Sequence, residues 1–292
     1  MIKSRRMRPA KAARLGFIYA LLTVLSIVWL VPIFWLLLQS FRLSPTGNVN
    51  SFFPSNFTFR NYILLFTDPT AGGIFFFRTL VNTLFVAVLT CIMSTLFILS
   101  IAYVLSRFRF RLRKPYMKLA LILGMFPGFL AIIAVFSMLG EIGLINGFWG
   151  LIGLSLVYSS AAGIGFFISK GYFDTVSKNL DEAARIDGAS NARVFFRIIL
   201  PLSKPIIVFT VLVAFIVPWS DFIFASFILR NAEWRTVPVG LFNLINEGTD
   251  AIDMFFTRFA AAAIIVAIPT SLLFLLMQRF YVAGITGGGV KG

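Results

Sequence analysis

Six long runs of apolar residues, five of them free of any charged side chain, constrain this chain more than any other sequence feature. Each run holds about 20 residues or more, and a helix of that length crosses the ~30 Å hydrocarbon layer of a bilayer. Helices are expected because an open strand would leave backbone groups unpaired in lipid. The six predicted spans are Phe17–Ser40, Thr79–Leu105, Leu119–Leu139, Trp149–Ser169, Pro205–Leu229 and Phe259–Gln278.

The composition agrees with an all-α, polytopic membrane protein and excludes several kinds of chemistry. Hydrophobic residues make up 59% of the chain and charged residues 13%, so the apolar content exceeds what a soluble core needs. The chain has no histidine, which excludes His-based catalysis and His metal ligands. Its single cysteine, Cys91, excludes an intrachain disulfide and is predicted to be a small buried hydrophobe.

The positive charges predict the orientation of the spans. Six spans place both termini on one side, together with residues 106–118 and 170–204, and this side carries 20 of the 26 Lys and Arg. By the positive-inside rule this side is cytoplasmic, and the net charge of +15 then needs no nucleic acid. The basic run after the second span is expected to meet lipid headgroups; it contains Arg107, Arg109, Arg111, Arg113 and Lys114.

The basic N-terminus resembles a signal peptide at first sight. The apolar run that follows it has 24 residues, however, which is longer than the usual h-region of about 7–15 residues. No small-x-small cleavage site follows this run. The sequence therefore predicts an uncleaved first span.

The longest predicted cytoplasmic connection, residues 170–204, shows a helix–turn–helix pattern. Asn179 is predicted to cap a short helix, with Glu182 at its third position as in a capping box. Asp181 and Arg185 are expected to pair at i,i+4. Gly188 suits a left-handed helix stop, after which Ser190 would cap a second helix that ends at Leu200, before Pro201. A helical elbow of this kind could dock into another protein or be a merely solvated or re-entrant loop.

The same segment resembles a known signature. Glu182, Ala183, Ala184, Gly188, Ile198, Leu200 and Pro201 have the spacing of the conserved loop in membrane subunits of binding-protein-dependent ABC importers. In that family the loop is a coupling helix that sits in a cleft of the ATPase subunit. The resemblance implies that Glu182 faces a basic residue of the ATPase and that Gly188 permits the bend. It also implies the type I ABC importer permease fold, with six spans and both termini cytoplasmic.

The resemblance extends over nearly the whole chain and is closest to the smaller permease subunit of maltose and maltodextrin importers. It includes Met125–Phe136, Lys170–Thr175 and the glycine-rich tail. In that subunit the tail reaches between the ATPases, whereas the alternative is an unstructured terminus. The outer segment Arg230–Arg258 would reach into the sugar-binding protein, or else be a solvated loop. The implied ATPase-contacting tail residues are Gly287, Gly288, Gly289, Val290, Lys291 and Gly292.

The resemblance also implies the partners and the division of the chain. The partners are a second homologous permease, two ATPase subunits that hold ATP and Mg, an extracytoplasmic sugar-binding protein, the lipid bilayer of the inner membrane and an oligosaccharide substrate. No cofactor and no catalytic residue is expected in this chain, which lacks a P-loop. The expected parts are residues 1–78, a five-helix permease core at 79–282 with the coupling loop 170–204, and a tail at 283–292.

Asp221 is the one acid inside a predicted span, and Pro218 precedes it by three residues. Because a lone carboxylate in lipid costs at least ~2.5 kcal/mol, Asp221 should face the bundle interior. It could line the translocation path or its outer gate, or it could make a structural hydrogen bond to a neighbouring helix. Pro127 and Pro269 should interrupt the third and sixth spans, as gating kinks or as packing bends. An ion-driven carrier is the rival interpretation, although it needs more ionisable groups inside the membrane than one Asp.

Overall fold

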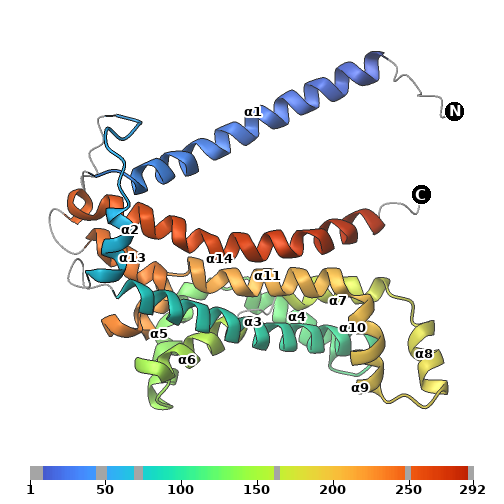
Figure 1. Ribbon diagram of the computed structural model, residues 1–292. Helices are drawn as coiled ribbons and strands as arrows, with labels where there is room; N and C mark the ends of the chain where they lie inside the picture. The colour runs from blue at the N-terminus through green and yellow to red at the C-terminus, as the bar shows by residue number, and fades with distance from the viewer. Residues whose placement is uncertain (1–8, 44–50, 69–74, 161–164, 247–250, 289–292) are drawn as a thin grey trace.

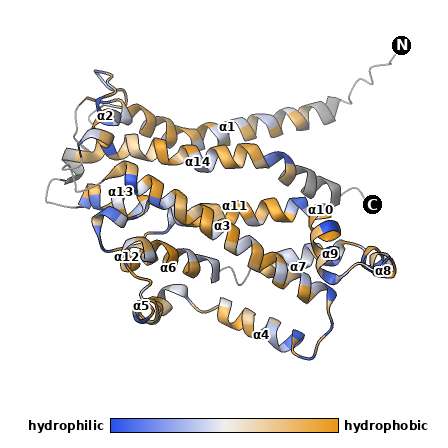
Figure 2. Ribbon diagram, turned by 60° about the horizontal axis from the view of Figure 1, so that its bottom comes forward, coloured by the Kyte–Doolittle hydropathy of each residue, from blue (hydrophilic) through white to orange (hydrophobic). Residues whose placement is uncertain are grey.

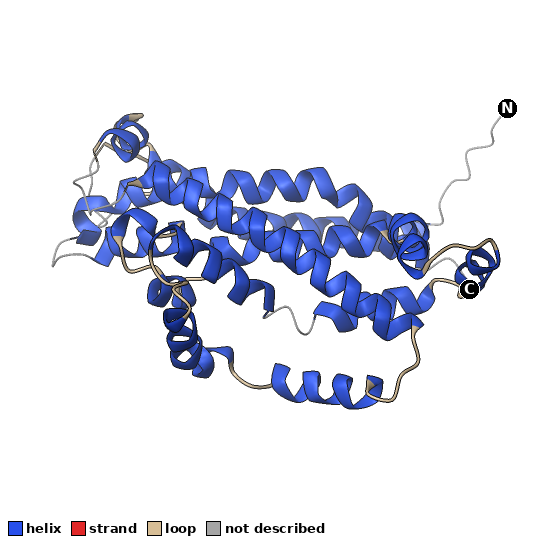
Figure 3. Cartoon of the chain, turned by 90° about the horizontal axis from the view of Figure 1, so that it is seen from below, coloured by secondary structure: helices blue, strands red, loops and turns tan. Residues whose placement is uncertain are grey.

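The computed structural model describes residues 9–43, 51–68, 75–160, 165–246 and 251–288. Within these ranges the chain forms helices and connecting loops, with no strand beyond an isolated antiparallel bridge between Arg42 and Phe57 (Figure 3). Hydrophobic residues run along the long helices, as Figure 2 shows. The all-α prediction is therefore confirmed for the described part of the chain.

Three helices are long and apolar enough to cross a membrane: α1 (Pro9–Ser40), α3 (Phe76–Arg107) and α14 (Ala251–Gly288). Two bent pairs would raise the number to five. The first is α6 (Gly147–Ser160) with α7 (Gly165–Thr175), bent by 50°. The second is the run from α9 (Asn191–Val194) to α10 (Leu200–Leu202), which meets α11 (Lys204–Ser220) at 86°. By length and composition, the described residues thus support three to five of the six predicted spans.

The third predicted span, Leu119–Leu139, is not one continuous helix. It divides into α4 (Arg113–Gly124), a 3-10 turn at Gly128–Ala131 and α5 (Ile132–Glu141). The break falls at Pro127, as expected, because proline has no N–H to continue the backbone ladder. At Pro269 the expected interruption is not found, since α14 continues through this residue as one helix, and a kink there stays a prediction.

The fifth predicted span, Pro205–Leu229, is shorter than expected. Helix α11 ends at Ser220, the backbone becomes extended at Asp221, and a separate short helix, α12 (Ile223–Ile228), follows. Asp221 therefore lies between two helices rather than inside one. At 1.5 Å per residue, the 17 residues of α11 span about 25 Å.

The long helices lie roughly side by side, with α3 and α11 in contact at the centre of the bundle (Figure 1). Helices α6 and α7 pack against α3, and α14 packs against α11. Helix α1 contacts α14 near Ser40 and diverges from it toward its start, leaving most of its apolar side chains exposed.

The two ends of the bundle differ (Figure 1). One end carries α2 (Arg60–Thr67), α5, α12 and α13 (Val237–Asn246), and the other carries α8 (Asn179–Ile186), α9 and α10. Helix α1 begins and α14 ends at the α8 end. The described ends of α1 and α14 thus lie at the same end of the bundle as α8, α9 and α10, and the cytoplasmic orientation of the termini stays a prediction.

The outer segment Arg230–Arg258 is more ordered than a solvated loop in its described part. It forms a 3-10 turn at Ala232–Trp234 and then α13, whose Leu244 is buried. The side-chain amide of Asn82 donates hydrogen bonds to the carbonyls of Glu233 (3.0 Å) and Arg235 (3.1 Å). The start of α3 therefore anchors this segment.

Part of the predicted tail contact falls outside the described residues. Gly287 and Gly288 end α14, whereas residues 289–292, with Val290 and Lys291, lie beyond the part of the chain that the structure describes.

Candidate functional site

We call residues Asn179–Leu202 the elbow; they form α8, a glycine turn and the run from α9 to α10. Figure 1 shows α8 standing away from the bundle, at the end where α7 and α10 lie. Gly188 has a φ of +79°, in the left-handed region that glycine adopts without a Cβ penalty. The N–H of Ala189 donates to the carbonyl of Ala184 at 2.9 Å and closes the turn. The predicted glycine stop is confirmed.

The caps of the two elbow helices match the prediction only at the second helix. Ser190 caps α9 as predicted, because its hydroxyl accepts a hydrogen bond from the N–H of Arg193 at 3.3 Å. Asn179 does not cap α8. It is the first helical residue, and its N–H donates to the hydroxyl of Ser177 at 3.3 Å. The helix thus begins one residue earlier than the capping box requires.

The predicted pair between Asp181 and Arg185 is not formed. Asp181 instead faces Arg107 at the end of α3, with 2.9 Å between the carboxylate Oδ2 and the guanidinium Nε. Their side chains are 6% and 2% exposed, so this ion pair is buried. Arg107 was expected at the lipid headgroups, and that expectation is wrong. Arg185 lies over the ring of Phe108, at 5.9 Å from its centroid.

The signature residues of α8 divide between an outer and an inner face. Glu182 and Ala183 are exposed, whereas Ala184 is buried in the apolar cluster between α3, α7 and α11. Ile186 lies one turn after Glu182 and is 86% exposed. Ile186 is an exposed apolar side chain on α8 that the sequence pattern did not single out. Glu182, Ala183 and Ile186 form what we call the outer face of α8.

Two of the three remaining signature residues pack against the bundle, and the third does not. Ile198 and Leu200 lie partly buried against the same cluster as Ala184, and Pro201 is exposed. The second helix continues through Pro201 to Leu202, whereas the prediction ended it at Leu200. The turn before it, Phe195–Ile199, is π-helical. Pro201 has no N–H to give to the carbonyl four residues earlier, which agrees with a widened turn at this place.

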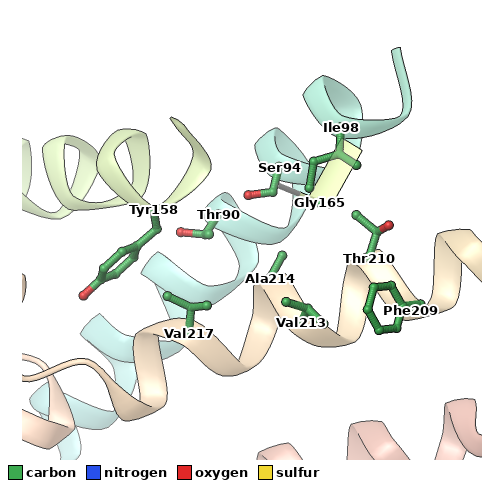
Figure 4. Close-up of a pocket in the computed structure, with 10 residues that line it drawn as sticks. All are labelled: Thr90, Ser94, Ile98, Tyr158, Gly165, Phe209, Thr210, Val213, Ala214 and Val217. Atoms are coloured by element: carbon green, nitrogen blue, oxygen red, sulfur yellow. The ribbon is translucent and has the colours of Figure 1, made fainter. Parts of the chain in front are cut away.

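A cavity of about 230 Å³ lies deeper in the bundle, between α3, α6, α7 and α11 (Figure 4). Most of its lining is apolar. Thr90 and Ser94 of α3 face it from one side and Thr210 and Ala214 of α11 from the other. Tyr158 lies at one end of the cavity (Figure 4). Its hydroxyl donates a hydrogen bond to Asp221 Oδ2 at 2.7 Å.

Asp221 makes hydrogen bonds to neighbouring helices, as the structural interpretation of this residue predicts. Besides the bond from Tyr158, its Oδ2 accepts the N–H of Ala225 at 3.1 Å and so caps the first turn of α12. Pro218, buried within α11, precedes the point where that helix ends. Asp221 therefore ties α6, α11 and α12 together beside the cavity.

Replacing Asp221 by leucine should lower the stability of the folded protein by about 2 kcal/mol, because the buried Tyr158 hydroxyl loses its acceptor. Asp221→Asn keeps an acceptor oxygen and should stay near the wild type. Thermal melting of the detergent-solubilised protein measures both, with Ser220→Ala, an exposed neighbour, as the control. A wild-type melting temperature for the leucine variant would contradict this role.

Several helices that can cross a bilayer, with a helical elbow at one end of the bundle, define a multi-pass membrane protein. The chain belongs to the family described as the binding-protein-dependent transport system inner membrane component, whose profile matches residues 94–286. The elbow lies within this match.

Relatives of this chain include permeases of sugar transport systems. The galactooligosaccharides transport system permease protein of Bacillus subtilis is 38% identical over 286 residues, which cover 98% of this chain and 99% of that protein. The maltodextrin transport system permease protein of Streptococcus pneumoniae is 36% identical over 277 residues, 94% of each chain.

A solved structure supports the fold. A chain from the crystal structure of a bacterial ABC transporter involved in the import of the acidic polysaccharide alginate superposes with a TM-score of 0.76. It covers 95% of this chain and 100% of its own length, at 22% sequence identity. The expected ABC permease fold is therefore confirmed, and the chain is a multi-pass component of the inner membrane.

Proposed function

We propose that this chain is the membrane-spanning permease subunit of an ATP-driven importer for an oligosaccharide, with maltose or maltodextrin and galactooligosaccharide as the two candidate substrates. The relatives of each kind differ by only two percentage points of identity, 38% against 36%, so identity does not separate the two. The chain would act without catalysis of its own, and ATP with Mg would bind to separate ATPase subunits.

The observation that carries the proposal is the orientation of α8. Its inner face is held in the core by Asp181 and Ala184, and its outer face presents Glu182, Ala183 and Ile186 to a partner. An apolar side chain flanked by a carboxylate is suited to a groove with an apolar socket and a basic rim. We assign that groove to the ATPase, and we assign the α8 end of the bundle to the cytoplasm by the positive-inside rule.

The other partners follow from the same family membership. We propose a second, homologous permease beside this one, two ATPase copies, and an extracytoplasmic binding protein at the α13 end. Closure of the ATPases would move the elbow and, through it, the bundle. The tail, Gly287–Gly292, would lie against the ATPases. Asp221 and Pro218 would act at the outer end of the translocation path, by holding α12 rather than by binding sugar.

Changing Ile186 to serine should weaken the co-purification of the ATPase subunit about tenfold, because truncating a central apolar anchor typically costs about 1–2 kcal/mol. Ile142→Ser is the matched control, since Ile142 is 66% exposed but follows α5 at the opposite end. Pull-down of the ATPase from membranes, at equal permease levels, measures both variants. Equal losses in the two variants would contradict the assignment of the outer face.

The proposed substrate is tested by uptake. A strain that lacks this gene should lose ATP-dependent uptake of labelled maltodextrin or of labelled galactooligosaccharide, and the restored gene should recover it. Uptake that continues without the ATPase would favour the ion-driven carrier and overturn the proposal. If the strain without the gene keeps its uptake of both sugars, the proposed substrate class is wrong, and the assignment as a permease subunit is unaffected.

A further inference from the structure

The last turns of α3 contact both the elbow and the segment that leads into it. The hydroxyl of Tyr103 donates to the carbonyl of Asn191 in α9 at 3.4 Å. Ser106 donates to the carboxylate of Asp174 in α7 at 2.7 Å. Nη2 of Arg107 donates to the carbonyl of Val176, just before α8, at 3.0 Å. One helix end thus contacts α7, the α7–α8 connection and α9.

The buried pair of Arg107 and Asp181 adds α8 to this set. Apart from each other, the only hydrogen-bond partner that these two side chains have among the described residues is the carbonyl of Val176, which accepts from Arg107. Beyond the contact between Nε and Oδ2, Nη1 of Arg107 and Oδ1 of Asp181 have no hydrogen-bond partner among the described residues. Each charge therefore depends on the other, because a buried charge without a partner is strongly unfavourable.

The geometry of a helix gives this pair a consequence for the outer face. Successive residues are about 100° apart around a helix, so Asp181 and Glu182 point in different directions. Asp181 and Ala184 face the core, while Glu182 and Ile186 face outward. A rotation of α8 by one residue would bury Glu182 and expose Asp181. An ion pair resists such a rotation better than apolar packing, which has no preferred direction.

We propose that Arg107 and Asp181 are positioning residues for coupling: they set the rotation of α8 against α3, so that force on the outer face is passed to α3. This inference rests on the proposed function, because it assumes that the ATPase pulls on α8. Neither residue would touch the ATPase or the sugar.

The test removes both charges at once, since either single variant would leave a buried charge alone. In Arg107→Met/Asp181→Leu the protein should insert and bind the ATPase as the wild type does. The amount of sugar imported per ATP hydrolysed should fall about tenfold, within the range found for changes along a coupling route. The matched control is Arg109→Met/Glu141→Leu, which removes one exposed basic and one exposed acidic charge outside the elbow and should leave this ratio unchanged.

Each outcome decides the matter. A wild-type ratio of import to hydrolysis in the double variant would overturn the proposal, and so would a failure to insert or to bind the ATPase, because the pair would then serve folding. If the wild-type chain itself binds no ATPase, the proposed function is wrong. This result is distinct from the results that overturn only the role of Arg107 and Asp181.

Discussion

Gly188→Val should reduce ATP-driven uptake at least about tenfold while the protein still inserts. Gly188 holds a φ of +79°, and a left-handed backbone costs an ordinary residue about 1–2 kcal/mol, more for a β-branched one. No atom outside its neighbours lies within 4 Å of a Cβ built there, so the effect comes from the backbone alone. The strain should open the turn and displace the outer face of α8.

Asparagine is the matched substitution, because it tolerates the left-handed region better than other residues with a side chain. Gly188→Asn should therefore keep most of the uptake, although it also adds a side chain at this position. Uptake of labelled sugar, normalised to the amount of inserted permease, compares the two variants. Equal loss in both would mean that bulk at the ATPase interface, and not backbone conformation, accounts for the effect.

Gly153→Ala should have the largest effect on stability, about 3 kcal/mol. A Cβ at this position in α6 would lie 2.2 Å from the carbonyl oxygen of Leu144 and 3.1 Å from its Cβ. That backbone cannot easily move away, because the N–H of Leu144 donates to the carbonyl of Leu139 at 2.8 Å. The added methyl group should separate α6 from the loop that follows α5.

Gly140→Ala is the control for this prediction. The nearest atom to a Cβ there is Cδ1 of Ile145 at 3.6 Å, an ordinary van der Waals contact. Size-exclusion chromatography of the solubilised protein after heating should show early loss of the Gly153 variant and little change for the Gly140 variant. A Gly153 variant as heat-resistant as the wild type would show that the loop gives way at little cost.

The apolar runs and the signature spacing determined much about this protein by themselves. Hydrophobicity in lipid depends on composition over about 20 residues, so the long helices α1, α3 and α14 could be predicted from the sequence. The left-handed Gly188 and the Ser190 cap could be predicted as well, because both depend on a few neighbouring residues. The family match over residues 94–286 agrees with the resemblance found in the elbow.

Only the tertiary structure decided which partner each polar group takes. Asp181 had a plausible local partner four residues away, yet it pairs with Arg107, which lies 74 positions earlier in the chain. Asp221 was placed inside a span by hydropathy, but Tyr158 and Ala225 hold it at a helix junction. Local pattern rules consider only residues close in sequence, whereas burial makes distant charges and hydroxyls find one another. The outer face of α8 could likewise be identified only from the structure, because it is the face opposite the buried residues Asp181 and Ala184.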